Sequence, residues 1–288
     1  MLIAFALGGM FLSSLLSGPI VMLMTGEPVS SVSRILLDPG HQREMQVVQV
    51  VSSVMMLLLP TLFTAGRLSK RPMELTGFRK TVSTRQIGLV VLITIFGMIL
   101  SGSLGYLSYQ LPFPESWQRS FQEFENTYLK QAVQMIKVDS VGALLVSLLV
   151  IALIPAVCEE TFFRGGLQNY LYRSNGKIWL SVVVVSLVFS AIHFSAYGFL
   201  SRFALGMMLG LIFQFTGSLW LSILFHGINN GAAVLMIYFQ RASGKTLEAI
   251  IADRDGSYWG LLALPLVVYF FILLKKDRKI NTTETDGI

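Results

Sequence analysis

Two adjacent glutamates, Glu159 and Glu160, follow an apolar stretch of the chain in the segment LIPAVCEETFFRGG. Adjacent carboxylates repel each other, and a low dielectric strengthens that repulsion. Glu160 and Arg164 are four residues apart, so on a helix they share a face and can pair. Glu159 points about 100° away from that face. The spacing predicts one glutamate held by the arginine and one that faces a different group; the alternative is a helix end whose two acids meet water.

Two of the three histidines lie within or at the ends of other apolar stretches. His193 follows Phe189 by four residues in FSAIH, and His226 precedes Asn230 by four residues in HGINN. Taken singly, each histidine is also explained by packing or by a hydrogen bond between helices. A charged group near the middle of a bilayer costs at least about 2.5–3.5 kcal/mol, so it usually faces a partner or a water-filled cavity. The histidines and the glutamates together therefore indicate a site.

One glutamate and two imidazoles from three helices support two kinds of chemistry. A carboxylate can act as a general base on a water molecule, while imidazoles steady an oxyanion. The same three side chains, Glu159, His193 and His226, can instead bind a divalent metal such as zinc. The sequence contains no H-E-x-x-H zinc motif, no G-x-S-x-G motif and no P-loop. The residues leave water activation and metal binding both open.

The elements that must position these residues are membrane-spanning helices. Of the 288 residues, 53% are hydrophobic and only 13% are charged, whereas soluble domains carry roughly 25% charged residues. A spanning helix needs about 20 apolar residues. We therefore predict an all-α, polytopic transmembrane helix bundle that forms a single membrane domain over residues 1–288. About eight spans are expected, at residues 2–24, 45–65, 87–111, 141–158, 178–194, 203–215, 219–239 and 258–274.

These boundaries place the three polar groups at different depths. Glu159 is expected near the cytoplasmic end of the fourth span, and His226 about 12 Å deep at a rise of 1.5 Å per residue. His193 is expected about 24 Å along the fifth span, near its outer end. Either the fifth span starts with a segment that dips into the membrane, or it is tilted and starts later than Lys177 suggests.

Basic residues in the predicted loops indicate the orientation. The loop 66–86 carries six basic residues and one acid, the basic tail 275–288 begins with KKDRK, and Arg164, Arg173 and Lys177 follow the fourth span. With eight spans these regions lie on one side, which the positive-inside rule makes cytoplasmic. We expect both termini in the cytoplasm and the protein in the cell membrane of a bacterium. The net charge of +6 requires no nucleic-acid partner, because the excess lies beside apolar runs.

The non-cytoplasmic loop, residues 112–139, contains an amphipathic pattern. Apolar residues recur at steps of three and four, with Glu115, Glu123, Glu125 and Lys130 elsewhere. An interfacial helix on the outer leaflet is the first interpretation, and a partner-binding helix is the alternative. The apolar face consists of Trp117, Phe121, Phe124, Tyr128, Ala132 and Met135.

The single cysteine and the N-terminal run have simple interpretations. With only Cys158 in the chain, no disulfide can form within it. A buried free cysteine is usually inert, so Cys158 is expected to be an apolar helix residue. The first apolar run lacks a basic start and a cleavage site, so it is predicted to be a span rather than a signal peptide.

The three polar patterns resemble the motifs of the CPBP or Abi family of intramembrane proteases, which includes the type II CAAX prenyl proteases. EETFFR at 159–164 is similar to the family's E-E-x-x-x-R, FSAIH at 189–193 to F-x-x-x-H, and HGINN at 226–230 to H-x-x-x-N/D. They occur in the family's order on separate predicted helices. The resemblance covers a motif-bearing core at about residues 141–240, and the first 140 residues and the last helix carry no matching motif.

The resemblance implies a water-dependent endopeptidase in a membrane-embedded cavity. Glu159 would be the general base, His193 would hold the water with it, and His226 and Asn230 would stabilise the oxyanion. Glu160, Arg164 and Phe189 would support them. The family has been described both as metalloproteases and as enzymes with a purely glutamate-activated water, so the resemblance leaves a zinc cofactor open.

The partners implied are the lipid bilayer and a membrane-associated peptide or protein substrate. Bacteria generally lack prenylated CAAX substrates, so bacteriocin processing, immunity and regulated processing are candidate roles. Two other classes of function fit the same residues. One is a non-catalytic membrane scaffold or immunity protein that works by binding. The other is a small proton-coupled transporter with a Glu/His relay, against which the lack of an evident internal repeat counts.

Overall fold

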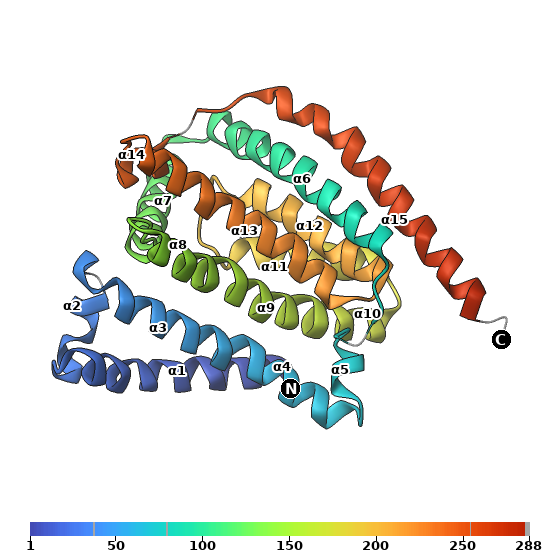
Figure 1. The fold of residues 1–288 in the computed structure, drawn as a ribbon, viewed down its shortest axis with the longest axis horizontal. Helices are drawn as coiled ribbons and strands as arrows, with labels where there is room; N and C mark the ends of the chain where they lie inside the picture. Colours follow the sequence, from blue (N-terminus) through green and yellow to red (C-terminus); the bar gives the residue numbers. More distant parts are fainter. Residues whose placement is uncertain (37, 79, 254, 286–288) are drawn as a thin grey trace. The chain divides into compact units, whose positions relative to one another are not determined.

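The computed structural model describes residues 1–288 except 37, 79, 254 and 286–288, and the residues it describes form helices and no strand. Seven helical segments are long and apolar enough to cross a membrane, and a shorter apolar helix, Ile178–Ala191, accompanies them. The predicted all-α polytopic bundle is thereby confirmed (Figure 1). The seven segments are Leu2–Thr25, Gln42–Leu68, Thr84–Gln110, Val141–Asn175, Phe199–Thr216, Leu219–Ala242 and Tyr258–Asp277.

The fourth predicted span was wrong at its C-terminal end. The expected segment stopped at residue 158, but the helical segment continues to Asn175 and is 35 residues long. Apolar composition marks where lipid is tolerated, whereas a helix continues wherever its backbone hydrogen bonds continue. Glu159 and Glu160 therefore lie inside a long helix and not at its end. The sixth span, predicted at 203–215, is also longer than expected and runs from Phe199 to Thr216.

The described chain divides into two compact units, and each is described by itself. Unit 1 consists of Met1–Thr76, Leu129–Gly166 and Gly227–Asp253, and unit 2 consists of Gly77–Tyr128, Leu167–His226 and Arg254–Ile288. The predicted motif-bearing core contributes residues to both units. Three of the boundaries fall inside helical segments, after Tyr128, Gly166 and His226, so the backbone passes from one unit to the other within a helix.

In unit 1, helix α1 (Leu2–Thr25) packs against one continuous helical segment, seen beside it in Figure 1. That segment consists of α3 (Gln42–Ser53), η3 (Val54–Leu58) and α4 (Leu59–Leu68). A Cβ at Gly9 of α1 would clash with the carbonyl of Met55, so glycine permits this close approach. Short helices complete the region: η1 (Val29–Ser31), α2 (Val32–Leu36), η2 (Pro39–His41) and α5 (Pro72–Leu75).

The Glu159-bearing segment forms the second part of unit 1. It begins with α8 (Val141–Ser147), which Ser140 caps by accepting a hydrogen bond from the amide of Ala143 at 3.2 Å. The segment continues through η4 (Leu148–Leu153) and α9 (Ile154–Glu160). Its apolar cluster includes Leu144, Val234 and Ile237, and draws on α13 (Leu219–Ala242) and α14 (Leu247–Ala252).

Three stretches of these helices are π-helical: η3, η4 and η5 (Thr161–Gln168). Pro60 follows η3 and Pro155 follows η4. A proline lacks the N–H group and clashes with the carbonyl four residues earlier, and a wider π turn accommodates this. No proline explains η5, which begins directly after Glu160 and contains Arg164. π turns are frequent at functional sites.

In unit 2, helix α12 (Phe199–Thr216) packs on three other helices, which are α6 (Thr84–Gln110), α11 (Ile178–Ala191) and α15 (Leu264–Thr285). One apolar core draws its buried residues from α6, α12, α15 and the first part of α13. The α6 and α15 helices run side by side (Figure 1). The turn η6 (Tyr258–Ala263) leads into α15, and α10 (Asn169–Asn175) leads into α11. Core residues include Ile93, Leu209, Ile212 and Phe225.

Close contacts in this core depend on small residues and caps. A Cβ on Gly210 of α12 would lie 2.7 Å from Oε1 of Gln168, whose Nε2 donates to the Gly210 carbonyl at 2.9 Å. The start of α6 has a capping box, in which Ser83 and Gln86 satisfy each other's backbone amides. Gly217, with φ of 68°, ends α12 in the left-handed conformation that glycine adopts easily.

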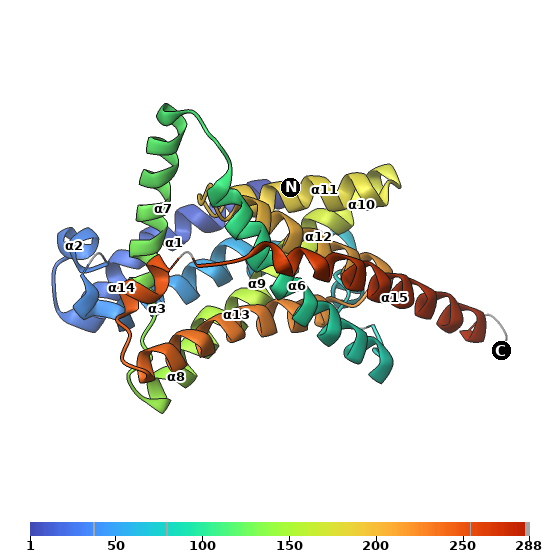
Figure 2. The same cartoon turned by 90° about the horizontal axis from the view of Figure 1, so that it is seen from above.

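The predicted amphipathic helix is present as α7 (Glu115–Met135), and its first part belongs to unit 2. Figure 2 shows α7 following α6 after a short connection. Trp117 and Phe124 of the predicted apolar face are exposed, at 57% and 52%, as side chains that meet lipid are in the protein alone. Glu125 was expected on the polar side but is buried, at 4% exposed. The carboxylate is buried because Ser195 and Tyr109 hydrogen-bond to it.

Candidate active site

In unit 1 the second glutamate of the pair is held by the arginine, as its spacing predicted. Arg164 Nη1 lies 3.1 Å from Glu160 Oε1, and both side chains are fully buried. The Arg164 guanidinium also lies 5.8 Å from the centre of the Phe163 ring. A buried pair needs excellent geometry to offset the cost of removing two charges from water. The pair therefore neutralises Glu160 within one helical segment.

The first glutamate of the pair has a different environment. Glu159 is partly exposed, although it is bonded directly to the fully buried Glu160. One helical step rotates it away from the Arg164 side. The two adjacent carboxylates thus differ in exposure, and Glu160 pairs with Arg164 as its spacing predicted.

Asn230 contacts the same helical segment in unit 1, some distance before the glutamates. Its Nδ2 donates to the carbonyl of Ile151 at 3.4 Å, and Asn229 Nδ2 donates to Asn230 Oδ1 at 3.2 Å. Ile151 is four residues before Pro155, and a proline cannot donate to that carbonyl as an ordinary residue in an α-helix would. Asn230 therefore has a structural partner in addition to the role that the family resemblance implies.

In unit 2 one phenylalanine ring lies close to both motif histidines. The centre of the Phe189 ring is 5.0 Å from that of His193, at an interplanar angle of 62°. It is 6.0 Å from that of His226, at 84°. Phe189 and His226 are buried, at 5% and 6% exposed. Edge-to-face packing of this kind holds aromatic rings in defined orientations. Phe189, the phenylalanine of FSAIH, therefore orients both imidazoles.

The prediction that His193 lies on a helix was wrong. Helix α11 ends at Ala191, and His193 is in the turn that follows. Its Nδ1 is 2.7 Å from the carbonyl oxygen of Phe189. Because a carbonyl can only accept, Nδ1 carries the hydrogen, and Nε2 carries the lone pair of the neutral ring. The next residue, Phe194, has φ of 49° and is the one non-glycine residue of the described chain with positive φ.

The expected difference in depth between His193 and His226 is also not observed. Helix α11 starts at Ile178, as the sequence suggested, but it is only 14 residues long. At 1.5 Å per residue it spans about 21 Å, less than the roughly 30 Å of a hydrocarbon core. The helix is therefore shorter than a full membrane span. Both imidazoles can then contact the one Phe189 ring.

The candidate residues thus divide into two groups. Glu159, Glu160, Arg164 and Asn230 belong to unit 1, and Phe189, His193 and His226 belong to unit 2. Among the described residues no group of three His, Cys, Asp or Glu side chains has the arrangement of a metal site. Neither unit by itself holds the Glu/His/His donor set. The chemistry proposed for the site uses the protein's own groups.

Two neighbours of the histidines were not found from the sequence. Ser190 Oγ donates to the carbonyl of Phe199 at 2.6 Å and closes the turn between α11 and α12. Ser195 Oγ accepts from the amide of Gly198 at 3.0 Å and donates to Glu125 at 2.8 Å. No periodicity signals these bonds, because their partners lie in a turn and in a distant helix.

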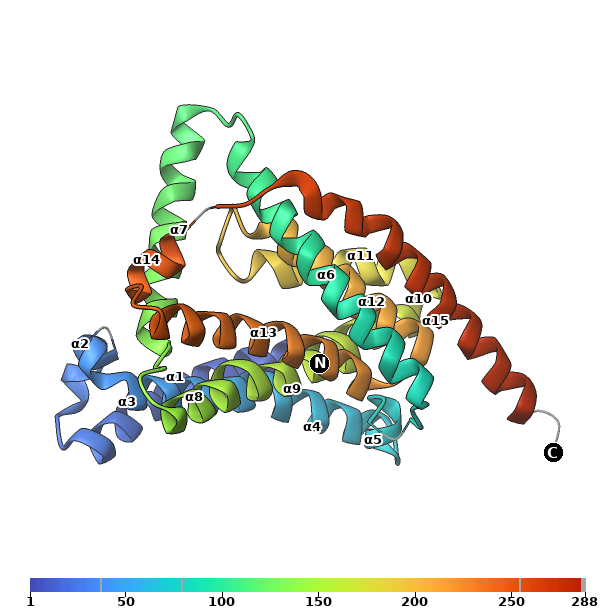
Figure 3. The same ribbon diagram turned by 45° about the horizontal axis from the view of Figure 1, so that its top comes forward.

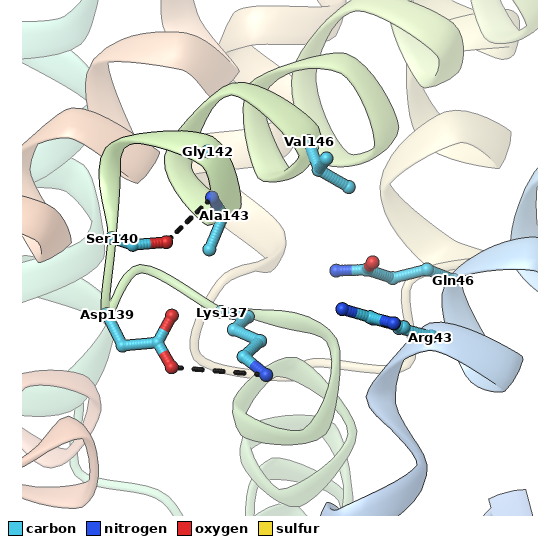
Figure 4. Close-up of a pocket in the computed structure, with 8 residues that line it drawn as sticks. All are labelled: Arg43, Gln46, Lys137, Asp139, Ser140, Gly142, Ala143 and Val146. Carbon is cyan, nitrogen blue, oxygen red and sulfur yellow. Dashed lines mark hydrogen bonds and ion pairs between the residues drawn. The ribbon is translucent and has the colours of Figure 1, made fainter.

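A cavity of about 500 Å³ lies elsewhere in unit 1 (Figure 4). Its lining contains none of the motif residues. Lys137 Nζ is 3.9 Å from Asp139 Oδ2 at its edge, and Arg43 and Gln46 face it from α3. The remaining lining residues are Ser140, Gly142, Ala143 and Val146. The cavity lies where α3 and α8 begin and does not form part of the candidate active site.

Comparisons with known proteins bear on the same region. Residues 141–232 match the model of the type II CAAX prenyl endopeptidase Rce1-like family. A 109-residue stretch is 29% identical to the uncharacterized protein YpbD of Bacillus subtilis strain 168, over 36% of this chain and 53% of that protein. The chain thus spans about half the length of this curated relative. No solved structure matches.

The family match contains all three motifs, from Glu159 to Asn230, and ends before the last predicted helix. It thereby supports the resemblance that those motifs indicated. Over residues 141–232, which hold all three motifs, the chain is thus similar to the type II CAAX prenyl endopeptidase Rce1-like family.

Proposed function

We propose that the protein is an intramembrane endopeptidase that cleaves a membrane-associated peptide or protein with a glutamate-activated water. The observation that carries the proposal is the packing of His193 and His226 against the one Phe189 ring. The neutralised Glu160–Arg164 pair beside Glu159 supports it. The similarity of the motif region to a peptidase family supports the reaction class.

In the proposed mechanism Glu159 removes a proton from water, and the water oxygen attacks the carbonyl carbon of the scissile peptide bond. His193 accepts a hydrogen bond from that water through Nε2, since Nδ1 donates to the backbone. His226 and Asn230 donate to the developing oxyanion. Protonated Glu159 then delivers its proton to the leaving amine as the C–N bond breaks. General-base catalysis of this kind contributes about 10²–10⁴-fold, and each oxyanion donor about 10²–10³-fold.

The test is cleavage of a peptide library by purified protein in proteoliposomes. We expect Glu159→Gln and Glu159→Ala to lower kcat/KM by about 10²–10⁴-fold, because the base is lost. Glu248→Gln, on the short helix α14, is the matched control and should cleave as wild type. Full activity of Glu159→Ala would contradict the mechanism. Parallel reactions with a chelator separate a metal requirement from a requirement for the glutamate alone.

We also infer an orientation with both termini in the cytoplasm of a bacterial cell. The basic loop between α4 and α6 and the start of the C-terminal tail support it through the positive-inside rule. Single cysteines at Lys70 and Trp117, placed in a Cys158→Ala background, test it with a membrane-impermeant maleimide on intact cells. Labelling at 117 but not at 70 is expected, and the reverse pattern would invert the topology.

A further inference from the structure

A buried carboxylate on α7 contacts the turn that carries His193, and both lie in unit 2. Glu125 Oε2 accepts from Ser195 Oγ at 2.8 Å, and Glu125 Oε1 accepts from the Tyr109 hydroxyl at 3.4 Å. Glu125 is 4% exposed and Ser195 is also 4% exposed. A carboxylate in this environment is tolerated because donors reach both of its oxygens.

Ser195 links this carboxylate to the backbone of the turn. Its hydroxyl accepts from the amide of Gly198 at 3.0 Å while it donates to Glu125. Only Phe194 stands between Ser195 and His193, and its φ of 49° is a left-handed conformation that is unfavourable for a non-glycine residue. A strained residue persists only where its surroundings hold it in place. The bonds at Ser195 hold the C-terminal side of that residue.

Aromatic contacts place both α6 and α7 against the same turn. The Tyr197 ring stacks on Tyr109 of α6 with centres 4.3 Å apart, and Phe121 of α7 lies 6.2 Å from Tyr197. Further along α7, the Arg202 guanidinium of α12 lies 4.6 Å from the centre of the Tyr128 ring. Figure 3 shows the turn between α11 and α12 extending toward α7. The helix thus has one anchor on the turn and a second on α12.

The N-terminal side of His193 is held by α11, the helix before it, through the bond from Nδ1 to the Phe189 carbonyl. Helix α11 therefore holds the N-terminal side of His193, and α7 holds its C-terminal side through Ser195. We propose that Glu125 is a positioning residue, which acts through Ser195 to hold the His193 turn in the conformation used for catalysis. This rests on the proposed function, and it assigns α7 a role in the reaction beyond association with the membrane.

The test compares Glu125→Ala, Glu125→Gln and Ser195→Ala with Glu123→Ala, an exposed glutamate on the same helix. Glu125→Ala and Ser195→Ala should each lower kcat by about 10- to 100-fold with KM little changed, since a misplaced catalytic group loses about this much. Glu125→Gln keeps an acceptor for Ser195 and should recover most of kcat. The double variant Glu125→Ala/Ser195→Ala should lose no more than either single variant, because the two residues act as one unit.

A measurement without substrate tests the same link. Amide hydrogen exchange in the peptide covering residues 190–200 should become about tenfold faster or more in Glu125→Ala and Ser195→Ala, and not in Glu123→Ala. If Glu125→Ala does not fold, Ser195→Ala still tests the proposal. Wild-type kcat and wild-type exchange in Ser195→Ala would overturn it, as would an equal loss of kcat in Tyr128→Leu, which removes only the second anchor. Full activity of Glu159→Ala would instead refute the proposed function and leave the exchange result valid.

Discussion

The two units hold polar groups in an apolar protein in different ways. In unit 1, Glu160 and Arg164 satisfy each other within one helical segment, four residues apart at 3.1 Å. In unit 2, His193 lies beyond the end of its helix and depends on a backbone carbonyl, on the Phe189 ring and on a turn bonded to another helix. The first arrangement is local in the chain, and the second is tertiary.

The difference has a consequence for stability and for function. A local ion pair forms whenever its helix forms, so it can be removed as a pair without loss of the surrounding packing. A side chain held by several elements changes position when any one of them moves. Mutations of the ion pair in unit 1 should therefore act first on folding, and mutations around His193 in unit 2 first on rate.

The largest effect is expected from breaking the ion pair on one side. Arg164→Met leaves Glu160 buried without its partner and should cost about 3–5 kcal/mol of unfolding free energy. The double variant Glu160→Leu/Arg164→Met should recover most of this loss. Reversible unfolding in mixed micelles measures both, with Lys177→Met, an exposed cation, as control. If the losses of unfolding free energy add in the double variant, Glu160 and Arg164 do not stabilise each other as a pair.

Removal of either imidazole should act on rate and leave stability nearly unchanged. His193→Ala and His226→Ala are each expected to lower kcat by about 10²–10³-fold, the usual loss for a group that stabilises charge in the transition state. The measurement is kcat on the best peptide found for wild type, together with the melting temperature of each variant. His41→Ala, outside the motifs, serves as the control. A fall in melting temperature without a fall in kcat would show that the two histidines contribute to packing and not to catalysis.

Substitution of the shared ring should affect both imidazoles at once. Phe189→Leu keeps an apolar side chain but removes the ring face and edge against which His193 and His226 pack. A misplacement of about 1 Å can cost about 10²-fold, and we expect a fall in kcat of about tenfold or more. Phe96→Leu, in the core of unit 2, is the matched control for lost aromatic packing. Equal effects of the two substitutions on kcat would remove the special role of Phe189.

The smallest effect is expected at Asn230, and it distinguishes two roles. As a donor to the Ile151 carbonyl, Asn230 should contribute about 1 kcal/mol to stability, and Asn230→Leu should lose it. In a Pro155→Ala background, the backbone amide at position 155 gains a hydrogen and can donate to that carbonyl, so the loss should shrink. Unfolding free energies of the four variants give this coupling. A loss of kcat without any loss of stability would instead favour the oxyanion role alone.

How far the sequence predicted the site depended on the range of each interaction. The pairing of Glu160 with Arg164 followed from a spacing of four residues, which a helix converts directly into contact. The buried state of Glu125 could not be predicted, because its donors Ser195 and Tyr109 are 70 and 16 residues away. Amphipathic periodicity placed Glu125 on the polar side, since periodicity takes no account of a specific partner.

The ends of the helices were also beyond what local sequence patterns could predict. The last predicted residues of the fourth and fifth spans were wrong, because hydropathy changes where the surroundings change and not where backbone hydrogen bonds stop. The π turns η3 and η4 are explained afterwards by Pro60 and Pro155, but η5 has no such signal in the chain.

By itself the sequence determined the class of the protein: apolar runs of membrane length require helices, because only internal hydrogen bonds can satisfy a backbone in lipid. It also determined which residues resemble the motifs of CAAX-type proteases, because the residue types and their spacings can be read directly from the chain. Only the tertiary structure decided that His193 lies in a turn, that Phe189 brings it to His226, and that α7 binds that turn. These depend on contacts between residues far apart in the chain, for which local pattern carries no information.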